Sequence, residues 1–152
     1  GKQRELHVSK AADVLDYRAS HARAVEPLAY AYEGFQRTAF IADSHFLVER
    51  VLATETAATM QTHNRPLIVM ALDQPLHLEC EGGSADLRAY QTALVPAGAQ
   101  SVSMRTDGGV APFLFIVPPA SLEMLQQRFH NAGVAQPTLQ TFLEQFQEPA
   151  HA

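Results

Sequence analysis

The chain has 152 residues, of which 47% are hydrophobic and 18% are charged, and its formal net charge is -5. This length suits one domain that buries roughly two thirds of its unfolded surface, and the composition argues against a disordered chain. The Lys and Arg residues are scattered singly. They argue against a nucleic-acid partner, because neutralising backbone phosphates requires clustered positive charge.

No apolar run approaches the roughly 20 residues that a bilayer-spanning helix needs, and the first residues, GKQRELH, lack the apolar stretch of a signal peptide. We therefore expect a soluble, cytoplasmic protein with no membrane partner. Cys80 is the only cysteine, which excludes an internal disulfide and a zinc cluster of thiolates. Because Glu79 and Glu81 flank Cys80 and oppose thiolate formation, we interpret it as a half-buried strand residue.

The chain is expected to begin with a short helix and a connector, which together take up residues 1–27. Ser9 is a suitable N-cap, and Ala11, Val14 and Leu15 fall on one face at the i, i+3 and i+4 spacing. The helical spacing then stops, which predicts the connector. The helix carries no nucleophile beside a base, so we interpret it as a packing helix on the edge of a barrel.

Residues 28–118 consist of short segments rich in Val, Leu, Ile, Phe and Tyr, each bounded by Gly, Pro, Asp or Asn. This pattern predicts an all-β sandwich or barrel with short connections. The candidate strands are 36–42, 45–53, 66–72, 76–80, 85–89, 92–95, 101–104 and 112–117.

Two candidate strands allow a prediction about their faces. In FLVERV, residues 46–51, one face holds Leu47, Glu49 and Val51, and both faces carry apolar and charged members. We expect this strand to span core and rim. LIVMAL, residues 67–72, is apolar on both faces and is the best candidate for a fully covered central strand.

Residues 119–152 are expected to form a helical appendage built as an amphipathic hairpin. Ser121 can cap a first helix that ends at Gly133, and Pro137 or Thr138 opens a second helix. The apolar stripe of this hairpin must be buried. We expect it to pack against the barrel, and the alternatives are a second copy or another chain. The stripe consists of Leu122, Leu125 and Phe129 in the first helix and Leu139, Phe142, Leu143 and Phe146 in the second.

Three segments carry a resemblance to a known family: RELHVSKAADVLDY at 4–17, SHFLVERV at 44–51 and TALVPAG at 92–98. They resemble the C-terminal half of type I mannose-6-phosphate isomerase, a zinc-dependent enzyme made of paired cupin barrels. The resemblance covers residues 1–118. It implies a mainly β, cupin-type (jelly-roll) barrel at 28–118, preceded by the short N-terminal helix. The C-terminal helical hairpin, predicted from residue spacing, lies beyond the resemblance.

In that family the zinc and the acid-base residues belong to the first half, so the resemblance implies no catalytic residue, no metal ligand and no cofactor in this chain. A metal-binding cupin usually has two histidines one residue apart and a further histidine after a P-x-G turn. Here the first place offers His63, Asn64 and Arg65, and the second carries Gln100 and Ser101. One imidazole does not hold zinc or iron against water. A metal-dependent cupin enzyme is therefore the second alternative.

The candidate ligand pocket consists of His63, Arg65 and Ser101. His63 and Arg65 stand at the entrance to the strand at 67–72, where their donors could meet an anionic sugar. The alternative for His63 is a loop histidine that is hydrogen-bonded to the backbone.

We expect a noncatalytic module in mannose and fructose 6-phosphate metabolism, without isomerase activity of its own. The alternative is a stand-alone cupin that binds or senses a sugar or sugar phosphate. The expected partners are a second copy in a homodimer, a separate N-terminal isomerase half that carries the zinc, or a sugar phosphate. The chain begins with Gly1. This start fits a piece of a longer isomerase. The alternative, that the chain is a complete cupin protein that stands alone, stays open.

Overall fold

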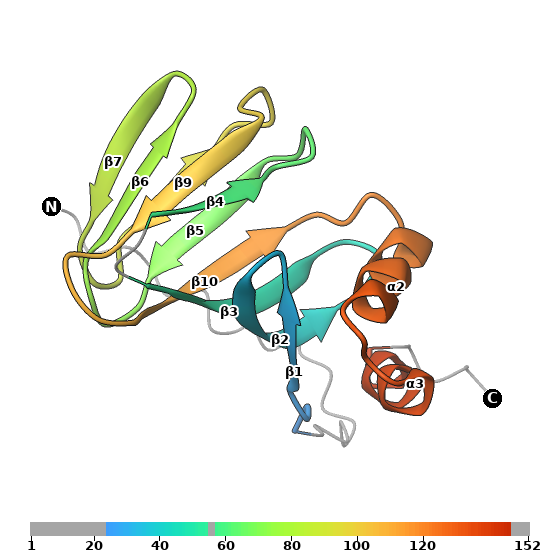
Figure 1. Cartoon of the computed structure of the whole chain (residues 1–152). Coiled ribbons are helices and arrows are strands. Elements are labelled where there is room, and N and C mark those ends of the chain that lie inside the picture. Colours follow the sequence, from blue (N-terminus) through green and yellow to red (C-terminus); the bar gives the residue numbers. More distant parts are fainter. Residues whose placement is uncertain (1–23, 55–56, 147–152) are drawn as a thin grey trace, which may run out of the picture.

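The computed structural model describes residues 24–54 and 57–146. These ranges hold ten strands in two antiparallel sheets, followed by two helices (Figure 1). The N-terminal helix expected after Ser9 lies outside these ranges, and only residues 24–27 of the expected connector fall inside them. No helix in the described ranges is long and apolar enough to cross a membrane.

The larger sheet has six strands in the order β1-β2-β3-β10-β5-β8, and every neighbouring pair is antiparallel. The pairing of β2 with β3 shifts between Ala39 and Ile41, which marks a β-bulge. The strands are β1 (Leu28–Tyr32), β2 (Phe35–Ala42), β3 (Leu47–Ala53), β5 (Leu67–Ala71), β8 (Thr92–Val95) and β10 (Ala111–Val117).

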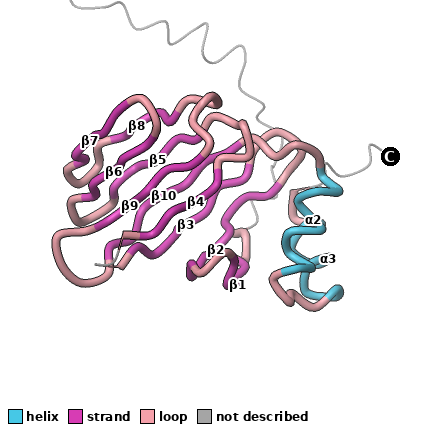
Figure 2. The backbone as a smooth tube through the Cα atoms, turned by 45° about the horizontal axis from the view of Figure 1, so that its top comes forward, coloured by secondary structure: helices cyan, strands magenta, loops and turns pink. Residues whose placement is uncertain are grey.

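The smaller sheet has four strands in the order β4-β9-β6-β7 and is also antiparallel. The two helices gather near β1 and β2, far from β6 and β7 (Figure 2). The strands of this sheet are β4 (Ala58–Gln61), β6 (Leu76–Cys80), β7 (Gly83–Leu87) and β9 (Ser101–Arg105).

The core lies between the two sheets, where alternate residues of each strand meet. Phe113 and Phe115 of β10, Val69 of β5, and Val102 and Met104 of β9 are all buried there. This arrangement follows from the period-2 alternation of strand side chains. The expectation of a mainly β fold is confirmed.

Most predicted strands are present, and 76–80 and 92–95 have the predicted bounds. Two strands, β1 and β4, were not among the candidates. The strand predicted at 85–89 begins earlier, at Gly83, because Cys80 pairs with Gly83 in a tight hairpin. Gly82 in that turn has a φ of 101°, a conformation that glycine adopts without steric cost.

The prediction for LIVMAL is half right. Strand β5 lies inside the larger sheet between β10 and β8, as a central strand should. The expectation that both of its faces are covered is wrong, because Ile68 is 39% exposed and its partner on β8, Leu94, is 69% exposed. This face points away from the smaller sheet.

Helices α2 (Leu122–Asn131) and α3 (Gln136–Glu144) form the expected hairpin. Ser121 caps α2 by accepting a hydrogen bond of 3.2 Å from the backbone N–H of Met124. The ring of Phe129 packs edge-on against Tyr30 of β1, with 5.0 Å between centroids. Most of the predicted apolar stripe is therefore buried against the chain's own sheet, through Leu125, Phe129, Leu139, Phe142 and Leu143. Leu122, which was also predicted in the stripe, is exposed instead.

Candidate functional site

Two neighbouring strands of the larger sheet each carry a charged residue at a core-facing position. Arg37 of β2 is 3% exposed, and Glu49 of β3 is fully buried. Strand alternation places Glu49 on the same face as the core residues Leu47 and Val51. A buried charge is costly unless it is paired and hydrogen-bonded, so both groups require partners inside the protein.

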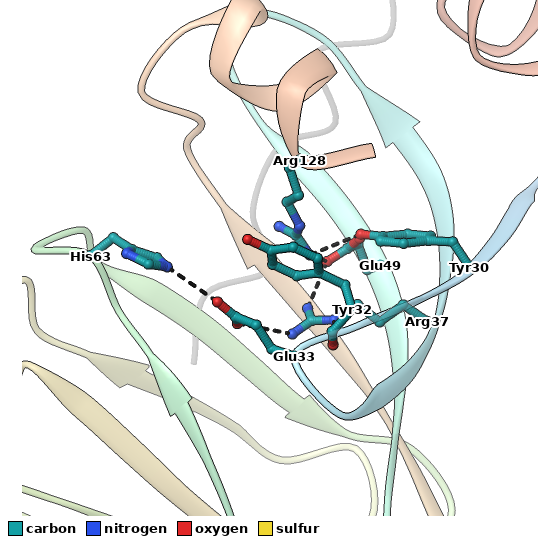
Figure 3. A network of polar contacts seen from close by, with 7 residues as sticks. All are labelled: Tyr30, Tyr32, Glu33, Arg37, Glu49, His63 and Arg128. Carbon is teal, nitrogen blue, oxygen red and sulfur yellow. Dashed lines mark hydrogen bonds and ion pairs between the residues drawn. The ribbon is translucent and has the colours of Figure 1, made fainter. Parts of the chain in front are cut away.

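Glu49 is the centre of a polar network that joins four elements, β1, β2, β3 and α2 (Figure 3). Its Oε2 accepts a hydrogen bond of 3.1 Å from Arg37 Nη1 and another of 2.6 Å from Arg128 Nη2. Its Oε1 accepts a hydrogen bond from the Tyr30 hydroxyl, which itself accepts one of 2.8 Å from Arg128 Nη2. We call Tyr30, Arg37, Glu49 and Arg128 the Glu49 network.

Burial and mutual repulsion shift the pKa values in this network. Burial and the positive charge of Arg128 lower the pKa of Arg37 to about 9, so its guanidinium stays protonated at neutral pH. Burial raises the pKa of the Glu49 carboxyl, while the charge and hydrogen bond of Arg128 oppose that rise. Tyr32 adds a cation-π contact to each cation, 4.9 Å from its ring centroid to Arg128 and 5.8 Å to Arg37.

A cavity of about 140 Å³ lies beside the network, between the ends of the two sheets and helix α2. Its apolar wall includes Leu67 and Phe115, and its polar lining is Tyr32, Glu33, Arg37, Gln61, Thr62, His63, Arg65 and Arg128. A cavity of roughly 150 Å³ is large enough to hold benzene. The cavity therefore matches one small ligand, or the charged end of a larger one.

His63 and Arg65, predicted from the sequence, both line this cavity. His63 is 54% exposed, and its Nε2 lies 3.6 Å from Glu33 Oε1 (Figure 3). Arg65 is half-buried and donates from Nη1 to the carbonyl oxygen of Pro118 at 3.3 Å. Burial and the charge of Arg128 lower the pKa of Arg65.

Ser101, the third predicted residue, is not among the residues that line the cavity. It opens β9 opposite Gln61, and the next residue, Val102, is buried. Strand alternation therefore turns Ser101 toward the outer face of the smaller sheet.

The turn that carries His63 is held by side-chain bonds and has an uncommon backbone. The Thr62 hydroxyl donates to the carbonyl oxygens of Ala99 at 2.5 Å and Gln100 at 3.0 Å. His63 and Asn64 follow with φ values of 54° and 58°, in the left-handed region that non-glycine residues rarely occupy. Such a turn places His63 at the rim in one defined position.

The charges around the cavity do not balance. Arg37, Arg65 and Arg128 supply three positive charges, and Glu33 and Glu49 supply at most two negative charges. Protonation of Glu49 would only increase the excess. In addition, Arg128 Nε is buried without a hydrogen-bond partner within the described residues. A site with surplus cations and a spare N–H donor is suited to an anion.

The same residues do not fit a metal centre. Across residues 24–54 and 57–146, no three His, Cys, Asp or Glu side chains lie close enough together to hold an ion. At the cavity, the pair His63 and Glu33 provides two such groups, and the three arginines Arg37, Arg65 and Arg128 would repel a metal ion.

The sequence analysis did not identify the residues of the Glu49 network. A usable signal was present in the strand pattern, because Arg37 and Glu49 occupy positions where the alternation demands apolar residues. Arg128 had a weaker signal, since it directly precedes Phe129 on the buried side of an amphipathic helix. No local pattern indicated that the three residues meet.

Comparisons with known proteins bear on the fold. No protein-family model and no curated protein sequence matches the chain. An ethanolamine utilization protein Q from Salmonella typhimurium LT2 matches with a TM-score of 0.51 and 14% identity, over 64% of this chain and 98% of that chain. The polyketide cyclase RemF from Streptomyces resistomycificus matches with a TM-score of 0.51 and 13% identity, over 65% of this chain and 78% of that chain.

A third structure, HppE in its apo form, has a TM-score of 0.51 and 11% identity, over 60% of this chain and 54% of that chain. These proteins share the cupin fold, so the expected cupin-type jelly roll with two C-terminal helices is confirmed. Their functions differ, and they do not single out mannose-6-phosphate isomerase. The likeness is one of fold alone.

Proposed function

We propose that this chain is a cupin-fold binding protein whose cavity beside α2 holds a small organic anion. The observation that carries the proposal is the surplus of guanidinium groups around the cavity, together with the unpartnered Nε of Arg128. Arg37 and part of Arg128 are occupied by Glu49. Arg65 and the spare donor of Arg128 are the groups left to bind a ligand.

A phosphate or carboxylate group fits these donors best. Guanidinium groups bind such oxyanions through paired hydrogen bonds of fixed geometry, and the strength of these bonds rises where water is excluded. At about 140 Å³, the cavity holds the anionic group, while the rest of a sugar phosphate would extend toward the rim at His63. Sugar phosphates are the class that the sequence resemblance favours.

Calorimetric titration and thermal unfolding with mannose 6-phosphate, fructose 6-phosphate, inorganic phosphate and mannose test the proposal. We expect saturable binding of at least one phosphate compound and no response to mannose. A ligand present at 100 times its Kd adds about 2.7 kcal/mol to the free energy of unfolding.

Arg65→Gln is the critical variant, because Arg65 is only partly buried and takes no part in the Glu49 network. It should weaken binding at least tenfold, whereas Arg88→Gln, at an exposed position away from the cavity, should leave binding unchanged. A flat response to all four compounds would overturn the proposal. Equal binding by the two variants would also overturn it.

The second candidate is a noncatalytic module that supports a separate isomerase half. The three resembling segments favour it, and so does the lack of a three-ligand group in the described part of the chain. A coupled assay with mannose 6-phosphate and added zinc should show no turnover by this chain. Turnover that a chelator abolishes would contradict both candidates.

A further inference from the structure

The outer faces of the two sheets differ in character. On the smaller sheet, one row of paired residues crosses all four strands and is wholly polar: Thr59, Ser103, Glu79 and Ser84. This is the usual pattern of an antiparallel sheet that has one face on the core and the other in water.

The larger sheet breaks this pattern. A row of aliphatic residues runs across five adjacent strands, in the order Ile41, Val48, Ile116, Ile68 and Leu94, each paired with the next by register. Ile68 and Leu94 are 39% and 69% exposed, and the other three are half-buried. We call this set the aliphatic row.

Further apolar residues widen the row. Leu114 pairs with Met70, and Leu52 pairs with Pro112, all at outward-facing positions. Arg50 is the one charged residue at the outward-facing positions of β3, β10, β5 and β8. Depletion of charge over an apolar centre is typical of a protein-protein interface rather than of a free surface.

The helical hairpin does not cover the aliphatic row. Phe129 packs against Tyr30, a core-facing residue, and Leu125 lines the cavity between the sheets. The hairpin therefore lies on the inner side of the larger sheet, and the row on the opposite side needs another cover.

We infer that the outer face of the larger sheet is the interface of a homodimer, in which two copies of the row pack against each other. Strands lie about 4.8 Å apart, so four gaps give the row a length of roughly 19 Å, and Val48 and Leu52 extend it by roughly 13 Å along the strand. The apolar area is then roughly 300–400 Å², since side chains overhang these limits. A standard interface buries about 800 Å² per partner, somewhat more than half of it apolar. One face therefore supplies most of the apolar area that a dimer requires.

The shape of the row also suits a second copy. A two-fold axis brings the same patch of both subunits together, so the patch must be complementary to itself. A row of aliphatic residues of similar size meets this condition, and two sheets can stack about 10 Å apart with their side chains between them. Arg50 lies between Val48 and Leu52 on β3, and its Nη2 donates a hydrogen bond of 3.4 Å to Thr38 Oγ1, which directs the guanidinium toward β2.

Sedimentation equilibrium of the full chain, without ligand and over a wide concentration range, tests this inference. We expect a species of twice the monomer mass. Ile68→Lys and Leu94→Lys should give monomers, because each places a charge in the middle of the interface. The matched control Thr59→Lys, on the polar face of the smaller sheet, should remain dimeric.

Leu94 is mostly exposed within one chain, so Leu94→Lys leaves the fold intact and decides the question if Ile68→Lys fails to fold. A wild-type chain that stays monomeric at high concentration would overturn the inference, including the case in which another part of the same chain covers the face. Dimers that persist in Leu94→Lys would overturn it as well.

Discussion

Arg128 of helix α2 donates a 2.6 Å hydrogen bond to Glu49 of strand β3, and this bond joins the helical hairpin to the interior of the sheet. The same guanidinium contacts the Tyr30 hydroxyl and the ring of Tyr32. Arg128 also lines the cavity, and its Nε is buried without a hydrogen-bond partner within the described residues. The contact that docks the hairpin therefore also positions the donor that we assign to the ligand.

Glu49→Ala should lower the free energy of unfolding by about 3–5 kcal/mol, because it leaves the buried Arg37 and the adjoining Arg128 without their shared counter-ion. Urea denaturation measures the loss. Glu79→Ala, which removes an exposed carboxylate from the smaller sheet, should change stability by no more than about 0.5 kcal/mol. Similar losses in the two variants would show that the Glu49 network adds little to stability.

The stability of the chain should also carry a pH signature of Glu49. Burial raises its pKa in the folded state above the ordinary value of 4.5. At pH values between 4.5 and the raised pKa of the folded state, Glu49 has lost its proton in the unfolded chain but keeps it in the folded chain. The free energy of unfolding therefore falls as the pH rises through this range. Below pH 4.5 this contribution is fully present.

Glu49→Gln isolates that signature, because the amide has nearly the same shape and does not titrate in this range. The stability of the wild type relative to Glu49→Gln should decrease as the pH rises from about 4.5, the value at which the unfolded carboxyl ionises. Urea midpoints at a series of pH values provide the comparison. A relative stability that increases with pH would mean that the two arginines outweigh burial.

Phe129→Ala should lower the free energy of unfolding by about 3–5 kcal/mol, the usual cost of deleting a buried aromatic ring. Phe129 is fully buried and packs edge-on against both Tyr30 and Phe142. Gln126→Ala, at an exposed position of the same helix, should have little effect. If Phe129→Ala unfolds at the same urea concentration as the control, the hairpin is not docked as described.

Thr62→Val should lower the free energy of unfolding by about 1–3 kcal/mol, because two carbonyl oxygens lose their shared hydroxyl donor while the side-chain shape is kept. The exposed Thr59→Val is the control. Hydrogen exchange of the Asn64 and Arg65 amides provides a local readout, and we expect faster exchange in Thr62→Val alone. Unchanged exchange would show that the Thr62 hydroxyl does not hold the turn.

Much of the architecture was predictable because strands and helices leave local patterns. Alternation in LHLEC gave the bounds of β6, and the Ser121 cap with the spacing of Leu125 and Phe129 gave α2. Strand β4 was not predicted, because its four residues, ATMQ, include one buried side chain and are too few to show an alternating pattern. The exposed face of LIVMAL was misjudged because apolarity alone does not reveal what covers a strand.

The site was predictable only at its rim. His63 and Arg65 are neighbours in the sequence, so their approach to one point was visible in advance. The contact between Glu49 and Arg128 spans 79 residues and depends on how the hairpin docks. Ser101 lies outside the cavity lining because a difference of one position along a strand reverses the face of the sheet to which a side chain points.

Proton-nitrogen NMR of the arginine Nε–H groups, recorded during titration with mannose 6-phosphate and with inorganic phosphate, tests the anion site most directly. If the cavity holds the anion, the Nε–H signals of Arg128 and Arg65 shift and saturate with at least one of these compounds. The signals of the exposed Arg88 and Arg105 should stay in place. An Arg128 signal that does not move with either compound, or one that moves no more than the signals of Arg88 and Arg105, would contradict the assignment of this cavity as an anion-binding site.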